Sequence, residues 1–444
     1  MAAQYAAHLL QSLGMPAALG PVRAESHPAI EWACSGLMAL TGQPGLPPLA
    51  CPVPLPSLAN GALAALAALA PARGIERLDG GVLLAERAAL GGLSRRGRTS
   101  CGGATHLLAC ADGDMAVTLS RPDDWELMPA WLEQSGVHDI AALGRAVAQR
   151  PRQDLLERGR MLGLPVASSA PPRHRAWHVM DAQASSPGRS PPATDRPLVV
   201  DLSGLWAGPL CGSLLALCGA RVVKVESGGR PDGARQGNPA HFHLLNAGKA
   251  SVALAFDTPR GREQLHALLR RADIVIEASR PRALMQLGID ARELVRERQG
   301  QTWISLTGHG LDPPADQWVA FGDDAGVSAG LSWIAGQCGP LALFCGDAVA
   351  DPLAGIHAAL LAWSVWLRGG GRYGVALSDV VSHGVGFVDA MDDATWTLRH
   401  HNWQQVLTEA AIEAQSPESR PVRESARALG ADTTAVLQEW GIRC

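Results

Sequence analysis

Asp351 and Pro352 stand at the start of an apolar run that continues to Leu367. An Asp-Pro pair is typical of a helix start, with Asp as the N-cap and Pro at the first helical position. The same place also suits chemistry, because a helix N-terminus stabilises an ionised carboxylate. Such a carboxylate can attack an acyl carbonyl and hold the acyl group as a mixed anhydride. Asp351 is therefore a candidate nucleophile, although the purely structural role is the commoner one for this pair.

A glycine-spaced loop follows the short apolar run Pro197–Leu202, with glycines at every fourth residue from Gly204 to Gly212. Pro209 is suited to begin a helix there. The pattern departs from GxGxxG, so it indicates only that a phosphate could approach a helix N-terminus. Glu226, at the end of the next apolar run, occupies the position of a ribose-binding acid in dinucleotide-binding folds. A tight turn and a solvated strand end are the structural alternatives.

The chain contains 38 basic residues, of which only Lys224 and Lys249 are lysines. Where nearly every cation is arginine, two lysines indicate sites at which a guanidinium does not fit. An ammonium is a compact point charge that suits contact with a phosphate in a tight space. Chance retention is the alternative explanation.

The elements that must position these residues alternate along the C-terminal half. Strand-like runs separated by helix-like runs predict βαβ units, hence a parallel sheet with helices on both faces. Ligands of such sheets bind beyond the carboxyl ends of the strands, where Gly204 and Glu226 are expected. The expected strands are 197–202, 221–226, 251–256, 273–277 and 302–306, and the expected helices between them are 259–271 and 291–297.

Composition divides the chain into three parts. Residues 168–195 are rich in Pro, Ser and Arg and are predicted to be a linker between residues 1–167 and residues 196–444. The net charge of −4 favours neither nucleic acid nor an anionic membrane as a partner. The apolar stretches 58–70 and 352–367 are too short or too interrupted to span a bilayer, and the N-terminus lacks the pattern of a signal peptide.

The nine cysteines are scattered, without a CxxC pair or histidines at zinc-ligand spacing. We therefore expect no metal site and no disulfide framework. Free cysteines of this kind suit a cytoplasmic location.

The two halves share a repeat at an offset of 294 residues. The segment GLMALTGQPG (36–45) matches GLSWIAGQCG (330–339), and the same offset pairs Cys51 with Cys345 and Gly61 with Gly355. Eleven of the 31 positions from 36 to 66 are identical. Ser57 stands opposite Asp351, so the first copy cannot perform chemistry that needs this carboxylate.

The C-terminal segments resemble the family III CoA-transferases, the CaiB/BaiF group that includes formyl-CoA transferase and α-methylacyl-CoA racemase. The resemblance lies in VVDLSGLWAGPLCGSLLALCGARVVKVE (199–226), HLLNAGKASVAL (243–254), ADIVIEASRPRALMQLGI (272–289), ADPLAGIHAALLAW (350–363) and the tail 423–442. It implies a Rossmann-like large domain in 196–444. Residues 36–69 are similar to the end of that large domain, and residues 109–132 and 158–167 are similar to the family's smaller α+β domain.

The resemblance implies a rearranged fusion of two partial copies. In the family the site lies between a large and a small domain of interlocked chains. Here one chain could supply both, so we expect either a homodimer or a pseudo-dimer within one chain.

Site residues follow from the matching positions. The family's catalytic aspartate falls on Asp351, and its CoA loop falls on Trp206 and Ala207. Its phosphate-proximal Asn-x-x-Lys falls on Asn246 and Lys249.

Other positions depart from the family pattern, with Ser227, Ala278 and Gln286 where an arginine, an asparagine and an arginine are usual. Arg280 or Arg282 could compensate as CoA contacts. The Gly-His-Asp of the racemases is Gly322-Asp323-Asp324 here, which lacks the histidine that acts as a second base.

The expected function is transfer of CoA from an acyl-CoA to a carboxylate through an aspartyl-CoA intermediate at Asp351, without a permanently bound cofactor. Backbone N–H groups near 101–103 or around 336–337 are candidates to stabilise the oxyanions. The alternatives are an acyl-CoA racemase or epimerase, a non-catalytic partner subunit, and an NAD-dependent oxidoreductase. The last is disfavoured by the missing GxGxxG and by the pair Asn246 and Lys249.

Overall fold

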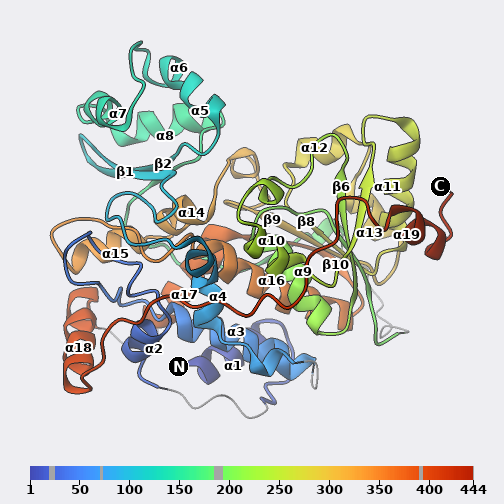
Figure 1. The fold of residues 1–444 in the computed structure, drawn as a ribbon, viewed down its shortest axis with the longest axis horizontal. Helices are drawn as coiled ribbons and strands as arrows, with labels where there is room; N and C mark the ends of the chain where they lie inside the picture. The colour runs from blue at the N-terminus through green and yellow to red at the C-terminus, as the bar shows by residue number, and fades with distance from the viewer. Residues whose placement is uncertain (20–25, 71–73, 185–193, 390–393, 444) are drawn as a thin grey trace.

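The computed structural model describes residues 1–19, 26–70, 74–184, 194–389 and 394–443 (Figure 1). Its largest element is a seven-stranded sheet of order β4-β10-β9-β8-β5-β6-β7, in which all neighbours are parallel except β4 and β10. Counted along the chain, the six parallel strands have the order 3-2-1-4-5-6 of a doubly wound fold. The strands are β4 (Val179–Met180), β5 (Leu198–Asp201), β6 (Arg221–Ser227), β7 (Ala250–Leu254), β8 (Ile274–Glu277), β9 (Thr302–Thr307) and β10 (Gly371–Ala376). This confirms the predicted Rossmann-like sheet.

Alternate side chains of the central strands enter two different cores. Val199 of β5 and Ile274 of β8 pack against one set of helices, whereas Val200 and Val275 face the other. Because successive side chains of a strand point to opposite faces, a strand covered on both sides is apolar at every position. One face is covered by α9 (Ala207–Leu217), α16 (Ala350–Leu367) and α17 (Leu377–Asp389), and the other by α11 (Pro259–Arg271), α13 (Ala291–Glu297) and α19 (Thr433–Glu439).

A second, smaller sheet belongs to a separate α+β domain, as predicted. Its antiparallel strands are β1 (Thr105–Cys110), β2 (Gly113–Thr118) and β3 (Val166–Ser168), and its helices are α5 (Pro122–Glu126), α6 (Met128–Leu132), α7 (Ile140–Val147) and α8 (Arg152–Met161). These elements enclose their own core around Trp131 and project from the rest of the molecule (Figure 1).

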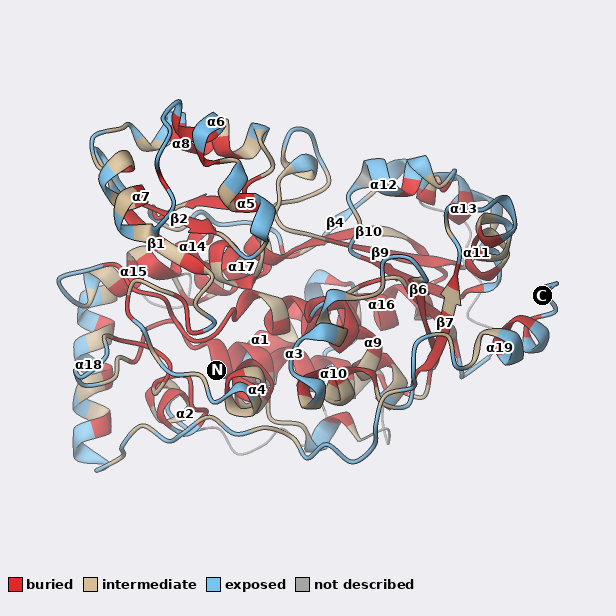
Figure 2. Ribbon diagram, turned by 45° about the horizontal axis from the view of Figure 1, so that its top comes forward, coloured by how far each residue is buried: buried red, intermediate tan, exposed pale blue. Residues whose placement is uncertain are grey.

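The remaining N-terminal helices pack into the large core, so packing does not follow the divisions at residues 167 and 196. These helices are α1 (Ala2–Ser12), α2 (Pro28–Cys34), α3 (Leu55–Leu69) and α4 (Gly80–Gly91). They share one core with α9, α16 and α17. The helix α16 is the one described helix long and apolar enough to cross a membrane, yet 89% of its apolar window is buried inside the protein. Figure 2 shows it in the buried centre, as a core helix.

The other helices complete the two layers and the loops. They are α10 (Pro239–Asn246), α12 (Pro281–Gln286), α14 (Gly322–Ser328), α15 (Leu331–Gln337), α18 (Trp396–Glu409) and the short 3-10 turns Ile75–Arg77, Ala182–Ala184, Gly233–Gln236 and Ala315–Gln317.

The predicted linker 168–195 takes more part in the fold than its composition indicates. Its segment β4 pairs with β10 as an antiparallel edge strand. Trp177 is 1% exposed, and its Nε1 donates to Ser12 Oγ at 3.1 Å. An edge strand tolerates the neighbouring prolines because only one side of its backbone is paired. Residues 185–193, the most Ser- and Pro-rich part, lie outside the described residues.

The repeat at offset 294 has structural counterparts. The bounds of α2 shifted by 294 coincide with those of α14, and α3 corresponds to α16. Gly36 and Gly330 both adopt positive φ, at 83° and 97°. The thiols of Cys51 and Cys345, equivalent in the repeat, contact each other.

The segment between α18 and α19 ties the halves together (Figure 1). Gln415 N donates to Ala33 O at 2.8 Å, and Gly430 N donates to Ser251 Oγ at 3.1 Å. Arg420 donates two hydrogen bonds of 2.8 Å to Glu86, a residue buried in α4.

Candidate active site at the first turn of α16

Asp351 lies in the first turn of α16, two residues beyond the N-cap rather than at the cap itself. The N-cap is Val349, which makes no side-chain capping bond. The helix begins earlier than predicted because Asp351 N donates to Ala348 O at 3.0 Å. The Asp351 side chain instead accepts a hydrogen bond at Oδ2 from the backbone N–H of Gly322, at 3.2 Å. The expectation of an N-cap was therefore wrong, while the position at the helix N-terminus was right.

The surroundings of Asp351 raise the pKa of its carboxyl group toward 7. Burial raises the pKa of Asp351 to about 7, and the charge of Arg87 acts in the opposite direction. Burial also raises the pKa of the neighbouring Asp323 to about 6, with a further contribution from Asp347. Asp351 nevertheless remains partly exposed. A raised pKa at a partly exposed residue is typical of functional sites.

Arg87, on α4, brings the N-terminal half into this site. Its Nε and Nη2 donate to Asp347 at 2.9 and 2.5 Å, and the Asp347 side chain is fully buried. Its guanidinium lies 5.3 Å from the centre of the Trp206 ring. Sequence reasoning missed this residue. The available signal was a Glu86-Arg87 pair inside an otherwise apolar helix, since charges in such a place require partners.

Two loops next to Asp351 contain strained backbone. Leu205 and Ala348 have φ of 65° and 47°, a conformation that side chains other than glycine rarely adopt. Strain of this kind persists where the surrounding structure fixes it, commonly at functional sites. The Leu205 loop is fixed by Asp232, whose Oδ1 accepts from Leu205 N at 3.0 Å.

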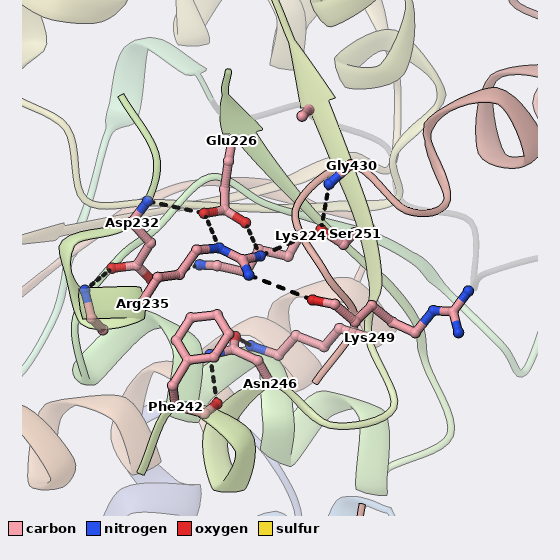
Figure 3. Close-up of polar contacts among 12 residues, drawn as sticks. Lys224, Glu226, Asp232, Arg235, Phe242, Asn246, Lys249, Ser251 and Gly430 are labelled. Atoms are coloured by element: carbon pink, nitrogen blue, oxygen red, sulfur yellow. Dashed lines mark hydrogen bonds and ion pairs between the residues drawn. The ribbon is translucent and has the colours of Figure 1, made fainter. Parts of the chain in front are cut away.

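Both lysines, labelled in Figure 3, donate to backbone carbonyls on either side of that loop. Lys249 Nζ donates to Asp201 Oδ2 at 2.8 Å, to Pro209 O at 2.8 Å and to Asn246 Oδ1 at 3.1 Å. Lys224 Nζ donates to Ser203 O at 2.8 Å. The predicted contact between Lys249 and a CoA phosphate does not fit this geometry, because all three N–H donors of the ammonium already have acceptors.

The glycine spacing makes room for this arrangement. A Cβ at Gly208 would lie 2.1 Å from Ser203 Oγ, and one at Gly212 would lie 2.8 Å from Asp201 Oδ2. The two glycines thus leave room for Ser203, Asp201 and the ammonium of Lys249 to pack together, and this cation contacts a carboxylate rather than a phosphate.

Glu226 is also engaged within the protein (Figure 3). It forms a two-point ion pair with Arg235, at 2.9 Å from Nε and 2.6 Å from Nη2. Its Oε1 further accepts from Asp232 N at 2.9 Å. The interpretation of Glu226 as a ribose-binding acid therefore does not fit, since both carboxylate oxygens already have donors.

Of the remaining predicted residues, two lie against α16 and two are exposed near the carboxyl end of β8. Ala207 begins α9, directly against α16, where a Cβ on Gly355 would lie 2.6 Å from Ala207 O. Trp206 precedes it and is 3% exposed. Arg280 and Arg282, at the start of α12, are exposed where the chain leaves the carboxyl end of β8.

Of the two glycine segments considered as oxyanion donors, only 101–103 is placed at this site. A Cβ on Gly102 would lie 3.5 Å from Arg87 Nη2, and the Cys101 thiol contacts Gly346 O at 3.4 Å. Gly336 packs against Ala342 instead. Within the described residues, no group of three or more His, Cys, Asp or Glu is arranged to hold a metal ion.

The fold and site together define a doubly wound α/β protein with a carboxylate at the start of a buried helix. Residues 197–369 match the family model of CoA-transferase family III. This segment, less than half of the chain, is therefore similar to that family.

Two curated relatives show how far the similarity extends. The chain is 31% identical over 179 residues to succinyl-CoA–D-citramalate CoA-transferase of Chloroflexus aurantiacus, covering 39% of this chain and 44% of that protein. It is 32% identical over 175 residues to formyl-CoA:oxalate CoA-transferase of Rhodopseudomonas palustris, covering 38% and 41%. The chain thus spans less than half the length of the curated relatives it matches. A solved CaiB/BaiF family protein from Brucella suis aligns at 26% identity and a TM-score of 0.41, covering 52% of this chain and 60% of that one.

Proposed function

We propose that this protein transfers coenzyme A between an acyl-CoA and a carboxylic acid, with Asp351 as the nucleophile. The observation that carries the proposal is the carboxylate of Asp351, a partly exposed residue, which accepts from Gly322 N–H at the start of α16 within the segment that matches the family. The named relatives are CoA-transferases.

The reaction proceeds in four balanced steps. The Asp351 carboxylate attacks the thioester carbonyl, the C–S bond breaks, and CoA thiolate leaves a mixed anhydride. The thiolate attacks the aspartyl carbonyl, which releases the donor acid and forms aspartyl-CoA. The acceptor carboxylate then attacks this thioester and displaces the thiolate. Attack of the thiolate on the acceptor carbonyl of the new anhydride yields the product acyl-CoA and regenerates the Asp351 carboxylate.

CoA lies at the carboxyl edge of the sheet, where ligands of doubly wound folds bind. Trp206 and Ala207 form the loop that faces it. Arg280 and Arg282 are the exposed cations at that edge and contact its phosphates. Asn246 and Lys249 support the loop from behind rather than contacting the phosphates.

The N-terminal half completes the site by supplying Arg87 and the loop 101–103. One chain therefore contains both sides of the site, which favours a pseudo-dimer within one chain. A homodimer of such chains and a cytoplasmic location remain compatible predictions.

The racemase alternative receives less support from the geometry. A second base would have to move a proton at the substrate, whereas Asp323, at the position of the racemase histidine, accepts from Ala348 N at 2.9 Å through Oδ1. We therefore place Asp323 as a positioning residue for the turn that precedes Asp351.

Trapping the covalent intermediate tests the proposal. The full chain is incubated with succinyl-CoA, glutaryl-CoA or formyl-CoA, treated with hydroxylamine, and digested for mass spectrometry. A hydroxamate on Asp351 with at least one donor, absent from Asp351→Asn, is the expected result. Modification at another residue, or none with any donor, would contradict the proposed nucleophile.

A further inference from the structure

Two buried polar atoms at the site lack partners among the described residues. They are Nε1 of Trp206 and Nε2 of His241, a residue of α10. Trp206 is 3% exposed and His241 is 7% exposed. A buried polar group without a hydrogen bond costs free energy, so such atoms call for an explanation. Because two of them occur on adjoining side chains, a shared ligand explains both at once.

The two rings form one unit. Their centroids are 5.2 Å apart and their planes are nearly perpendicular, at 88°. This edge-to-face contact fixes the orientation of both rings. The unit is preorganised, so binding a group there costs little side-chain entropy.

The N–H donors of this pair suit an anion, and Arg87, which is paired with Asp347, lies beside them. Arg87 lies over the Trp206 ring, 5.3 Å from its centre. Burial lowers the pKa of His241 to about 4, with Arg87 and Arg420 acting in the same direction, so the imidazole is neutral at pH 7. An indole nitrogen only donates, and a neutral imidazole donates through Nε2 in one of its tautomers. Two N–H donors beside a guanidinium match the two oxygens of a carboxylate.

The position of the pair links it to Asp351. Trp206 directly precedes Ala207, whose carbonyl packs against Gly355, one turn beyond Asp351 on α16. Arg87 connects the two places, since it lies over Trp206 and its charge acts on Asp351. The side chain of Arg87 is 32% exposed, so an anion enters from its side.

We propose that Trp206 and His241 form the subsite that holds the reacting carboxylate of the acid substrate beside Asp351. This inference rests on the proposed function and adds a role for two side chains that face the acid rather than the CoA moiety. Trp440 serves as the matched control, because its Nε1 is also buried without a partner among the described residues but belongs to the opposite face of the sheet.

The test is isotope exchange between succinyl-CoA and ¹³C-labelled succinate by the full chain. Trp206→Phe and His241→Phe each remove a donor and keep a ring, and Trp440→Phe repeats the indole change elsewhere. We expect the KM for succinate to rise about 10- to 100-fold in the first two, as for a lost hydrogen bond to a charged group. The KM for succinyl-CoA should stay within about twofold in His241→Phe and Trp440→Phe, since neither residue belongs to the loop placed against CoA. Circular dichroism and thermal melting establish that each variant is folded.

The outcomes separate this inference from the proposed function. If wild type exchanges label and is trapped at Asp351, while both site variants keep the succinate KM of Trp440→Phe, the subsite is refuted and the proposed function stands. In that case a buried water explains the two atoms. Wild-type protein that neither exchanges label nor is trapped would overturn both.

Discussion

The helices α3 and α16 occupy equivalent places in the repeat, yet their first turns differ in the one respect that matters for chemistry. Ser57 in α3 is fully buried, and its Oγ donates to Glu31 Oε2 at 2.5 Å. Asp351 in α16 is partly exposed beside Arg87. The shared framework therefore places a residue at each helix start, and Asp351 differs from Ser57 in being a carboxylate, in being partly exposed and in lying near a cation.

The same two helices agree where packing decides the residue. A Cβ at Gly61 of α3 would lie 2.7 Å from Ala2 O, and a Cβ at Gly355 of α16 would lie 2.6 Å from Ala207 O. Each glycine lets the start of another helix approach, α1 in one case and α9 in the other. The glycine that is identical in both copies thus serves close packing between helices. The change from Ser57 to Asp351 instead alters the chemistry available at the helix start.

The largest expected effect comes from substituting the residue at the start of α16, compared with the matching substitution at the start of α3. Asp351→Asn should reduce CoA transfer by more than about a thousandfold, because it removes the proposed nucleophile. Ser57→Ala should leave turnover within about twofold. Steady-state kinetics with succinyl-CoA measure both, and turnover of purified Asp351→Asn near the wild-type value would end the distinction between the copies.

Much of the architecture was predictable because local signals agreed with the fold. The bounds of α11 and α13 coincide with the prediction, since Thr258 and Asp290 cap them and their apolar positions have helical period. The parallel sheet followed from alternating strands and helices. Asp351 was located at a helix start, with an error of two residues at the cap.

What sequence reasoning could not reach depends on contacts between distant segments. Arg87 is paired with Asp347, 260 positions away in the chain, and nothing local to either residue indicates this. Lys249 was assigned to a phosphate because Asp201, at the end of β5, was not recognised as its partner. The strand β4 was hidden in a proline-rich segment, since an edge strand needs only a few residues.

Arg87→Met should give the next largest effect and tests how far the copy that contains Asp351 depends on the N-terminal half. It leaves the fully buried Asp347 without its partner, which typically costs about 3–5 kcal/mol. Urea unfolding measures the loss. In the double variant Arg87→Met with Asp347→Asn, which removes the unpaired charge, most of the lost stability should return. A single variant as stable as wild type would show that the ion pair does not join the halves.

Gly61→Ala and Gly355→Ala should each destabilise the protein by about 1–3 kcal/mol, because the added methyl group forces adjoining backbone apart. Their effects on transfer should differ. Gly355→Ala displaces the loop that carries Trp206 and should raise the KM for the acid, whereas Gly61→Ala displaces only α1. If both variants raised the KM for the acid equally, the idea that only the Gly355 contact positions the site would be wrong. Gly144, with open space around its Cα, provides a neutral Gly→Ala control.

The last prediction concerns the pH dependence of transfer and of stability that follows from Asp351, for which Ser57 of the first copy has no counterpart. Burial raises the pKa of Asp351 to about 7, and the nucleophile must be ionised, so transfer should fall about tenfold per pH unit below that value and level off above it. Because Asp323 titrates near 6 in the same cluster, the apparent pKa belongs to the group rather than to one residue.

The stability of the folded protein should change with pH in the opposite direction. A carboxyl group whose pKa is raised in the folded state binds its proton more tightly there, so its contribution to stability declines as pH rises from about 4 to about 7. The neutral side chain of Asp351→Asn does not titrate, so this variant should gain stability relative to wild type as pH rises from about 4 to about 7, and the gain should level off above that. Equal pH dependence of unfolding in the two proteins would show that Asp351 titrates near its ordinary value.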